Sequence, residues 1–480
     1  METGFEDIAT LLVRQARRSP GAPALTCAGE SVTCAELGER VERIAGGLAR
    51  DIRRGEPVAL LAELSIAHVA ALLGVLRAGG CVVPLPGPPA FTDAARARMI
   101  ADCGARVVLE RADLTGLDGP APAMAALEPD APCNIIYSSG TTGQPKGIVQ
   151  SHRMRWHQVR RMGRLGLEAG ARVLVATPLW SNTTLITLLP TLCRGGHAVL
   201  LPRFDEAAFL ELARREAVTH TMLVPVQYQR ILGHPAFERA DLKGFRRKLC
   251  TGAPLAPSTK RELLERWPGD LIEIYGQTEG GPTTVLDAAR HPDKLSSVGR
   301  PADGVELRVI DPAGRELPVG EAGEVVGRAA SMMLGYHNRP ELTGALTWRD
   351  AGGRAFYRSG DIGRLDADGF LHLLGRAKDV IISGGQNVHA VDLEQALGEH
   401  EGVAEVAVIG VPDPRWGERP LAVVVPRPGV ALEATALAAW ANARLAPAQR
   451  LCGVALVAEL PRGPTGKVLK TELRRLVGAS

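Results

Sequence analysis

The chain has 480 residues, 45% of them hydrophobic, so it can bury a large core and is too long for one simple domain. Its 56 basic and 53 acidic residues are dispersed and nearly cancel to a net charge of +3, which argues against a nucleic-acid-binding protein. The eight cysteines are scattered without a C-x-x-C pair, which argues against a zinc site or a disulfide framework.

The amino terminus is acidic and lacks an apolar signal core, so we expect a protein of the reducing cytoplasm. The longest apolar region, residues 58–84, carries Glu63, His68 and Arg77 and a double glycine. It therefore cannot supply the roughly 20 uninterrupted apolar residues of a membrane span. We expect it to contain a helix at 71–76 and a strand at 81–85.

Short apolar runs alternate with helical patterns through the first three quarters of the chain. The expected strands are 107–109, 134–137, 173–176, 198–201 and 271–275. Such alternation predicts layered α/β subdomains with parallel strands. Residues 305–326 instead predict a small β element rich in hairpins.

A charged stretch around Lys378 lies between Gly375 and the double glycine 384–385, and is a plausible linker. Beyond it, the patterns predict a helix at 391–398, strands at 403–411 and 420–425, a helix at 432–445 and a strand at 454–460. We therefore expect a large amino-terminal domain, residues 1–375, and a small α+β carboxy-terminal domain, residues 376–480.

The string YSSGTTGQPKG, residues 137–147, follows an expected strand. Glycines let the backbone approach an anion closely, while hydroxyls and a lysine add donors and positive charge. An ordinary Ser/Gly turn is the alternative, but the uninterrupted string favours a nucleotide-phosphate loop. No Gly-Lys-Ser/Thr follows, so it is not a Walker loop. The candidate phosphate-binding residues are Ser138, Ser139, Gly140, Thr141, Thr142, Gly143 and Lys146.

This string resembles the signature of the adenylate-forming superfamily, which comprises acyl- and aryl-CoA synthetases, luciferases and the adenylation domains of peptide synthetases. The resemblance implies that ATP binds through its β- and γ-phosphates while a carboxylate attacks the α-phosphate. Four further motifs follow in the expected order and extend the resemblance over nearly the whole chain. It implies a large domain of three subdomains and a small mobile lid hinged near Lys378.

The second motif, residues 275–281, comes at the carboxyl end of an expected strand, where α/β sheets place ligands. Tyr275 is suited to stack on adenine, Thr278 to donate to the α-phosphate and Glu279 to hold Mg²⁺. A plain strand end with a turn is the alternative, and the match to the family's second signature favours the functional interpretation. The resemblance also assigns the adenine slot to small residues: Gly252, Ala253 and Pro254. Gly276, in the second motif, is a further candidate ATP/AMP-binding residue.

Asp361 is suited to accept hydrogen bonds from both ribose hydroxyls, although an Asx turn would explain it as well. The resemblance places Arg376 on the ribose and phosphate side. Lys467 lies on a glycine-flanked tip near the end of the chain. Such lysines are usually only solvated, but the family's terminal motif implies that Lys467 balances charge on the attacking carboxylate and the α-phosphate.

The chain departs from the family at the acyl pocket, where relatives often carry an aromatic-histidine pair. Here Trp180 is followed by Ser181, so a histidine role is excluded, and Trp180 either lines the pocket or is a core residue. No charged residue is placed to meet an α-amino group, which favours a neutral aryl or alkyl carboxylic acid. The pocket candidates are Trp180, Ser181, Asn182, Gly280 and Gly281.

Residues 446–451 lack the aromatic-lysine-x-proline segment that relatives often show, and only Arg450 keeps a useful charge, which weakens the case for CoA. In its favour, Ser383, Gly384 and Gly385 would let a pantetheine arm pass close to the backbone. Trp416 lies in a segment that resembles one meeting the CoA nucleotide in aryl-CoA ligases.

The first hypothesis is therefore an ATP-dependent acid:CoA ligase that uses Mg²⁺. The second is a stand-alone enzyme that loads a carrier-protein pantetheine. A catalytically silent nucleotide-sensing protein would not need Lys146, Glu279, Asp361, Arg376 and Lys467 together. We expect a monomer or homodimer with no nucleic-acid partner.

Overall fold

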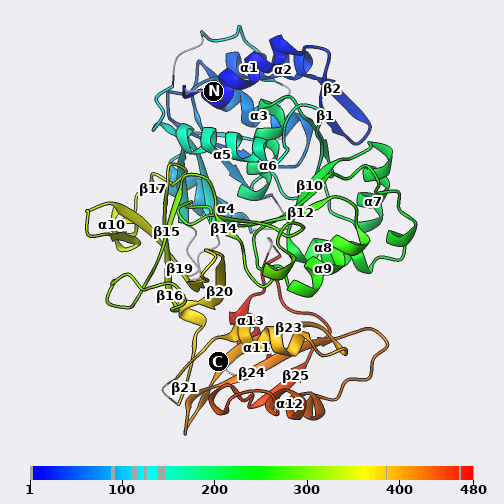
Figure 1. The fold of residues 1–480 in the computed structure, drawn as a ribbon. Helices are drawn as coiled ribbons and strands as arrows, with labels where there is room; N and C mark the ends of the chain where they lie inside the picture. Colours follow the sequence, from blue (N-terminus) through cyan, green and yellow to red (C-terminus); the bar gives the residue numbers. More distant parts are fainter. Residues whose placement is uncertain are drawn as a thin grey trace. The chain divides into compact units, whose positions relative to one another are not determined.

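The computed structural model describes residues 4–87, 92–110, 114, 116–123, 127–138, 146–384, 386–463 and 466–478. The chain forms two compact units (Figure 1). Unit 1 comprises residues 1–295, 301–306 and 327–357, and unit 2 comprises residues 296–300, 307–326 and 358–480. This mixed α/β fold, with one large and one small unit, confirms the expected fold class. The domain division at residue 375 stays a prediction.

The larger sheet has the strand order β14-β13-β12-β11-β10-β8-β9-β1-β2. Neighbouring strands from β12 to β1 run parallel, and antiparallel strands lie beyond both of them. Its strands are β1 (Pro23–Cys27), β2 (Glu30–Thr33), β8 (Arg172–Val175), β9 (His197–Leu200), β10 (His220–Leu223), β11 (Arg247–Cys250), β12 (Asp270–Tyr275), β13 (Thr284–Asp287) and β14 (Arg300–Pro301).

A second sheet of unit 1 has the order β17-β7-β6-β4-β3-β5. The strands β6, β4, β3 and β5 run parallel to one another, whereas β7 pairs antiparallel with β6 and β17 pairs antiparallel with β7. The bounds are β3 (Pro57–Leu61), β4 (Cys81–Leu85), β5 (Val107–Leu109), β6 (Pro132–Ser138), β7 (Lys146–Ser151) and β17 (Gly335–Tyr336). The parallel strands expected from the sequence are present in both sheets.

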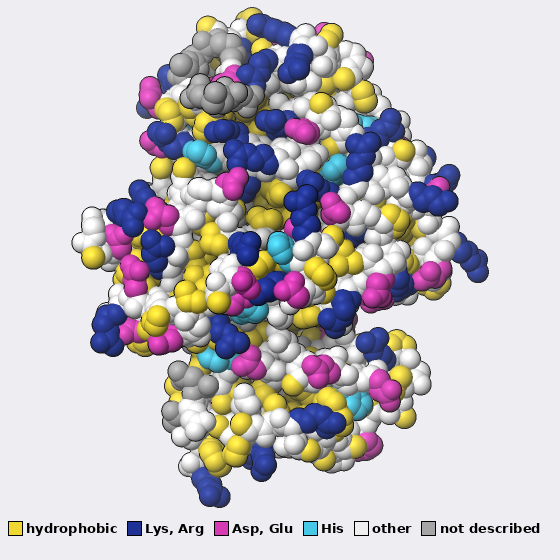
Figure 2. Space-filling view, viewed as in Figure 1, with side chains coloured by type: hydrophobic (Ala, Val, Ile, Leu, Met, Phe, Trp, Pro, Cys, Tyr) yellow, Lys and Arg dark blue, Asp and Glu magenta, His cyan; other side chains and the backbone are white. Residues whose placement is uncertain are grey.

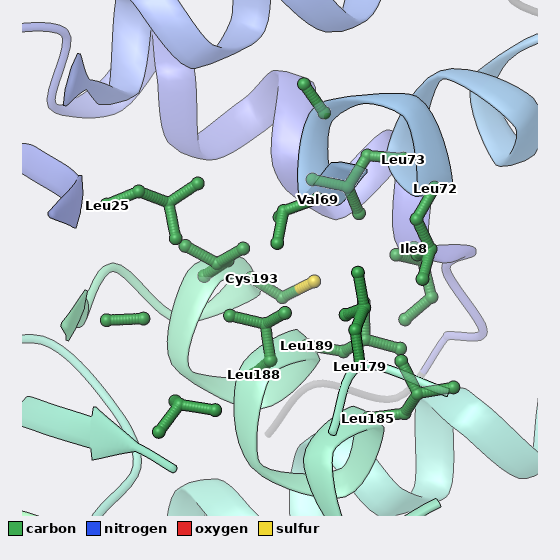
Figure 3. Close-up of a cluster of buried hydrophobic side chains, with 14 of the residues drawn as sticks. Ile8, Leu25, Val69, Leu72, Leu73, Leu179, Leu185, Leu188, Leu189 and Cys193 are labelled. Atoms are coloured by element: carbon green, nitrogen blue, oxygen red, sulfur yellow. The ribbon is translucent and has the colours of Figure 1, made fainter. Parts of the chain in front are cut away.

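The helices of unit 1 are α1 (Ile8–Arg18), α2 (Cys34–Leu48), α3 (Ile66–Arg77), α4 (Asp93–Cys103), α5 (His152–Arg164), α6 (Asn182–Cys193), α7 (Glu206–Arg215), α8 (Pro225–Gly233), α9 (Pro257–Arg266) and α10 (Pro340–Ala345). Leucines of α6 gather with Ile8 of α1 and Val69 of α3 in one buried cluster (Figure 3). The α3 helix is longer than expected because Ser65 caps it, accepting from the His68 backbone N–H at 3.3 Å.

In unit 2, a sheet of order β22-β21-β24-β23, with β25 beside β24, forms a core with α11 and α12. The bounds are β21 (Ile381–Ser383), β22 (Gln386–Val388), α11 (Ala390–Gly398), β23 (Val403–Asp413), β24 (Gly417–Pro426), α12 (Ala434–Asn442), β25 (Gly453–Leu456) and α13 (Lys470–Leu476). The helix expected at 432–445 begins later because Glu433 is extended, with φ −99° and ψ 126°, and it ends at Asn442, where Ala443 is the carboxy-terminal cap. The strand expected at 454–460 ends at Leu456, where its pairing with β24 stops.

Another sheet has the order β15-β16-β19-β18, with β20 paired to β19. Its strands are β15 (Val305–Ile310), β16 (Gly323–Ala329), β18 (Thr347–Arg349), β19 (Ala355–Leu365) and β20 (Leu371–Arg376). The hairpin-rich β element expected at 305–326 is therefore present as β15 and the start of β16. Basic and acidic side chains are interspersed over the face shown in Figure 2, in keeping with the net charge of +3. None of the described helices is long and apolar enough to cross a membrane.

Candidate active site

The flanks of the predicted phosphate loop belong to one antiparallel hairpin of unit 1. Ser138 ends β6, Lys146 begins β7, and the two residues pair in the ladder. The Lys146 ammonium lies 5.9 Å from the centre of the Tyr336 ring, within the range of a cation–π contact. Ser139, Gly140, Thr141, Thr142 and Gly143 lie outside the described residues, so the phosphate loop itself stays a prediction.

The predicted adenine-slot residues leave two neighbouring strands at the same edge of the sheet. β11 and β12 are parallel, and Cys250 pairs with Glu273. Gly252, Ala253 and Pro254 therefore follow one strand, and Tyr275 and Gly276 end and follow the other. Thr251 Oγ1 donates to the Ile274 carbonyl at 2.8 Å and so links the ends of these two strands.

A buried ion pair between α9 and β12 stabilises this edge of the sheet. Lys260 Nζ of α9 lies 2.5 Å from Glu273 Oε2 of β12. Glu273 Oε1 accepts from the Leu255 backbone N–H at 2.9 Å, directly after the small-residue turn at 252–254. Burial raises the pKa of Glu273, and the charge of Lys260 opposes this shift. The pair thus fixes the end of the turn to β12.

Gln150 joins two residues that the sequence assigned to different roles. Its Nε2 donates to the Thr278 carbonyl at 2.6 Å and to Asn182 Oδ1 at 3.4 Å. Its Oε1 accepts from Asn134 Nδ2 at 3.0 Å, and Arg155 Nε donates to Asn134 Oδ1 at 2.7 Å. The structure thus brings the predicted α-phosphate contact and a predicted acyl-pocket residue to one buried amide.

Sequence reasoning missed Gln150 and Arg155. A signal for Gln150 was present, because it is a polar residue after Ile148 and Val149 in an apolar strand. Arg155 is fully buried, and desolvation lowers its pKa to about 10. Buried polar groups need partners, and the side-chain oxygens of Asn134 and Gln158 accept from Nε and Nη1 of this arginine.

The Glu279 carboxylate accepts a hydrogen bond from Tyr336. The Tyr336 hydroxyl is 2.7 Å from Glu279 Oε1 and 3.4 Å from the Tyr357 hydroxyl, which in turn donates to Gln277 Oε1 at 3.2 Å. Within the described parts of the chain, Glu279 Oε2 accepts no hydrogen bond and the carboxylate has no cationic partner. A carboxylate oxygen with spare lone pairs fits Mg²⁺, which prefers hard oxygen ligands.

The two glycines assigned to the acyl pocket have a packing reason of their own. Gly280 and Gly281 both have φ 76°, in the left-handed region. A Cβ at Gly280 would stand 2.0 Å from the Ser331 carbonyl oxygen, and one at Gly281 would stand 2.9 Å from Tyr357 Cβ. Protein atoms therefore already occupy the space beside these glycines. Their place in the acyl pocket stays a prediction.

Trp180 and Ser181 are held by the start of α6. Trp180 is half-buried and packs against the main hydrophobic cluster of unit 1, in line with the alternative of a core residue. Ser181 is the helix cap and accepts from the Thr184 backbone N–H at 3.2 Å. Its hydroxyl thus serves the helix, and both pocket assignments stay predictions.

The predicted sugar clamp and the predicted catalytic lysine lie near one another in unit 2. Asp361 of β19 pairs with Arg376 of β20, with 2.7 Å between Oδ1 and Nε. Lys467 is exposed on the tip between Gly463 and Val468. Partial desolvation and then the charge of Arg376 lower the pKa of the Lys467 amine, whereas Asp361 raises it. Lys378 also acts on this amine, so all four predicted residues share one electrostatic neighbourhood.

Three of the predicted CoA-binding residues, Ser383, Gly384 and Trp416, meet around the β21–β22 hairpin of unit 2. Ser383 pairs with Gly417, and the Gly384 backbone N–H donates to the Trp416 carbonyl at 2.8 Å. Gly384 has φ 58°, and a Cβ there would stand 2.6 Å from the Trp416 ring. Arg450 is exposed after the 3₁₀ turn Pro447–Gln449. Gly385 lies outside the described residues.

Models of two protein families match the chain. The AMP-binding enzyme model matches residues 12–118 and 110–337, and the model of the AMP-binding enzyme C-terminal domain matches residues 392–467. The chain belongs to the AMP-binding enzyme family. The resemblance to adenylate-forming enzymes that the motifs indicated is thereby confirmed, and ATP and CoA are substrates of CoA ligases in this family.

This AMP-binding enzyme is similar over nearly its whole length to curated proteins. A feruloyl-CoA synthase of an Amycolatopsis species is 38% identical, over 97% of this chain and 98% of that protein. An indoleacetate–CoA ligase of Aromatoleum aromaticum is 32% identical, over 97% of both chains. ScoC of Streptomyces coeruleorubidus, a fatty acid–[acyl-carrier-protein] ligase, is 30% identical, over 96% of this chain and 94% of that protein.

Solved structures resemble the enzyme equally completely. The ATP-bound structure of MatB from Rhodopseudomonas palustris superposes with a TM-score of 0.87 and 30% sequence identity. The match covers 98% of this chain and 99% of that one. The likeness therefore includes both units rather than one shared subdomain.

Proposed function

We propose that this enzyme is an ATP-dependent acid:CoA ligase that acts on a neutral aryl or alkyl carboxylic acid. The observation that carries the proposal is that Gln150 binds both the Thr278 carbonyl and the Asn182 side chain. It holds the predicted α-phosphate contact beside the predicted wall of the acyl pocket. An acid bound against Asn182 would have its carboxylate next to the reacting phosphorus.

In the first half-reaction, a carboxylate oxygen of the acid attacks the α-phosphorus of ATP, and the bond from that phosphorus to pyrophosphate breaks. Lys146 binds the departing phosphates, and the Thr278 hydroxyl donates to the α-phosphate. Lys467 places its ammonium where two negative groups must approach. Glu279 is the side chain that would hold Mg²⁺, which neutralises phosphate charge when bound.

In the second half-reaction, the sulfur of CoA attacks the acyl carbonyl, the carbon–oxygen bond to AMP breaks, and the thiol proton is lost to solvent. The Trp416 ring packs where a Gly384 side chain would stand, so the ring and the exposed Gly384 backbone form one surface. A pantetheine arm fits such a surface, and exposed Arg450 would pair with a phosphate of CoA.

The class of acid follows from the neutral groups around Gln150. Amides and a backbone carbonyl are suited to an uncharged acyl group with a few polar substituents. The charged Arg155 side chain donates to Asn134 Oδ1 and not to Gln150. The names of the feruloyl and indoleacetate relatives point in the same direction, so we propose an arylpropenoic or arylacetic acid.

A panel of acids tests the proposal. Pyrophosphate release and thioester formation would be measured with cinnamic, arylacetic, benzoic and alkyl acids, each with and without CoA. We expect thioester with at least one neutral aryl acid and none with amino acids. Pyrophosphate release restricted to amino acids would overturn the acid class, and acyl-AMP that CoA never consumes would overturn the acceptor.

The alternative acceptor is a carrier-protein pantetheine. The absence of the aromatic-lysine segment at 446–451 favours it, since Arg450 alone offers charge to a CoA nucleotide there. The name of the ScoC relative gives a precedent in that protein. Transfer to a pantetheine-bearing carrier protein at a kcat/KM about tenfold or more above that with CoA would favour this alternative.

A further inference from the structure

One segment of unit 1, residues 333–339, connects the hairpin of the phosphate loop to the Glu279 turn. This connecting segment includes β17, which pairs antiparallel with β7. Leu334 N donates to the Val149 carbonyl at 2.8 Å, and His337 N donates to the Gly147 carbonyl at 2.7 Å. The segment is therefore fixed alongside the strand that begins with Lys146.

The same segment contacts Glu279 twice. Met333 N donates to the Glu279 carbonyl at 2.8 Å, and the Tyr336 hydroxyl donates to Glu279 Oε1 at 2.7 Å. Tyr336 is buried, its backbone pairs with Ile148, and its N–H donates to Thr343 Oγ1 at 3.0 Å. The fold therefore fixes the position of this buried hydroxyl.

The far end of the segment reaches the opposite flank of the phosphate loop. Arg339 Nη2 donates to Asp102 Oδ1 at 2.8 Å, and the Tyr137 hydroxyl donates to Asp102 Oδ2 at 2.7 Å. Tyr137 directly precedes Ser138, and Gly147 directly follows Lys146. The connecting segment therefore contacts β7 and the Glu279 carboxylate directly, and it is linked to Tyr137 of β6 through Asp102.

We propose that Tyr336 is a positioning residue that holds the Glu279 carboxylate in one orientation relative to the phosphate-loop strands, with Oε2 left for a divalent cation. The inference rests on the proposed role of Glu279 toward the cation of Mg-ATP. A carboxylate ordered before the ligand arrives loses little conformational entropy on binding. Without the hydroxyl, Glu279 would have to become ordered when the cation binds. The entropy lost in that step would lower the cation affinity.

Tyr336→Phe tests this directly, because it keeps the ring that Lys146 faces and removes only the hydroxyl. ATP–pyrophosphate exchange would be measured across a Mg²⁺ series, and Mn²⁺ binding would be measured by electron paramagnetic resonance with a non-hydrolysable ATP analogue. We expect the Mg²⁺ concentration at half-maximal rate and the Kd for Mn²⁺ each to rise about tenfold. We expect the rate at saturating Mg²⁺ to change much less.

Tyr228→Phe is the matched control. Tyr228 is also buried, and its hydroxyl donates at 2.8 Å to the carbonyl of Leu249 in strand β11. Its loss removes a buried hydrogen bond without touching Glu279, so we expect parental Mg²⁺ dependence. If the control shifts as much as Tyr336→Phe, the effect is general destabilisation and the inference is overturned.

Glu279→Gln separates this inference from the proposed function. If Glu279→Gln leaves the Mg²⁺ requirement and Mn²⁺ affinity unchanged, the cation role of Glu279 is wrong and the inference goes with it. If Glu279→Gln raises the Mg²⁺ requirement and lowers the Mn²⁺ affinity while Tyr336→Phe matches the parent, only the role of Tyr336 is overturned. In the double variant we expect no further loss beyond Glu279→Gln, because the hydroxyl acts through that carboxylate. A multiplicative loss would place Tyr336 elsewhere in the reaction.

Discussion

Asp361 and Arg376 form an ion pair across neighbouring antiparallel strands, with Oδ1 and Nε 2.7 Å apart. The residue proposed to accept from the ribose hydroxyls is therefore held in place by a cation before any nucleotide arrives. The ion pair orients the carboxylate, and a carboxylate has further lone pairs that can accept from hydroxyls. The two residues are best regarded as one unit for binding the sugar.

We predict that Asp361→Asn weakens ATP binding about tenfold or more and leaves acid binding nearly unchanged. The amide retains the shape of the side chain, but it replaces one acceptor with a donor and leaves Arg376 without its ionic partner. Titration calorimetry with a non-hydrolysable ATP analogue is the measurement. Asp368→Asn, at an exposed turn residue, is the control and should bind as the parent does. Equal ATP affinity in Asp361→Asn and the parent would contradict the ribose role.

We predict that Lys467→Ala slows ATP–pyrophosphate exchange about 100-fold while the melting temperature stays unchanged. An exposed side chain on a turn contributes little to stability, but the charge is needed where the carboxylate and the α-phosphate meet. Because desolvation and Arg376 lower the pKa of Lys467, its cation is lost at a lower pH than an ordinary lysine. Adenylation should therefore fall on the basic side below the usual lysine range, and Lys467→Arg should move that fall upward. If the exchange rate of both proteins stayed independent of pH on the basic side, this assignment would be wrong.

The sequence predicted the parts of the site that lie within continuous motifs. Lys146 begins β7, and Thr278 and Glu279 lie in the turn after β12, as the alternation of apolar runs indicated, whereas Asp361 lies inside the long strand β19. Local spacing could not reveal Tyr336, because it is 57 residues from the Glu279 that it contacts. The pairing of β17 with β7 and the bond from Met333 N to the Glu279 carbonyl bring the two together in the fold.

The two glycines after Glu279 illustrate a second limit. A glycine pair in a sequence is compatible with open space for a ligand and with close backbone packing. Only the neighbours decide, and here the Ser331 carbonyl oxygen occupies the place of a Gly280 side chain. Helix α12 shows the same limit, because its apolar pattern extends over 432–445 but the backbone is helical only over Ala434–Asn442.

We predict that Lys260→Met lowers the free energy of unfolding by about 3–5 kcal/mol, because Glu273 would be left charged or forced to take up a proton in the core. Urea unfolding monitored by fluorescence gives this value. The double variant Lys260→Met/Glu273→Leu removes both charges and should recover part of the loss. A single variant as stable as the parent would show that the pair contributes nothing to this edge of the sheet.

We predict that His220 contributes to acid destabilisation. Burial and the charges of Arg247 and Arg246 lower its pKa from 6.5 to about 4. Between those values the unfolded chain binds a proton that the folded chain does not, so stability is present above pH 6.5 and is lost as the pH falls toward 4. His220→Asn should flatten this decline by about 2–3 kcal/mol between pH 7 and pH 4.5. Urea midpoints at the two pH values test it, and an unchanged slope would remove His220 as the cause.

The last prediction concerns Lys378, which lies in a 3₁₀ turn, Ala377–Asp379, directly after β20. The resemblance implies a lid that serves the two half-reactions in two orientations, and such motions are absorbed by a few linker residues. Lys378→Pro would fix φ near −65° and would also restrict Ala377, which removes the freedom that a hinge needs. Lys378→Ala keeps that freedom and is the control.

If Lys467 serves adenylation and Gly384 with Trp416 serves transfer, locking this turn should impair one half-reaction at least about tenfold more than the other. Single-turnover kinetics would follow acyl-AMP formation and then its consumption by CoA. The alanine control should retain both rates, because it changes the charge but leaves the backbone free. Equal losses in both steps for Lys378→Pro, or no loss in either, would contradict a lid that turns at this residue.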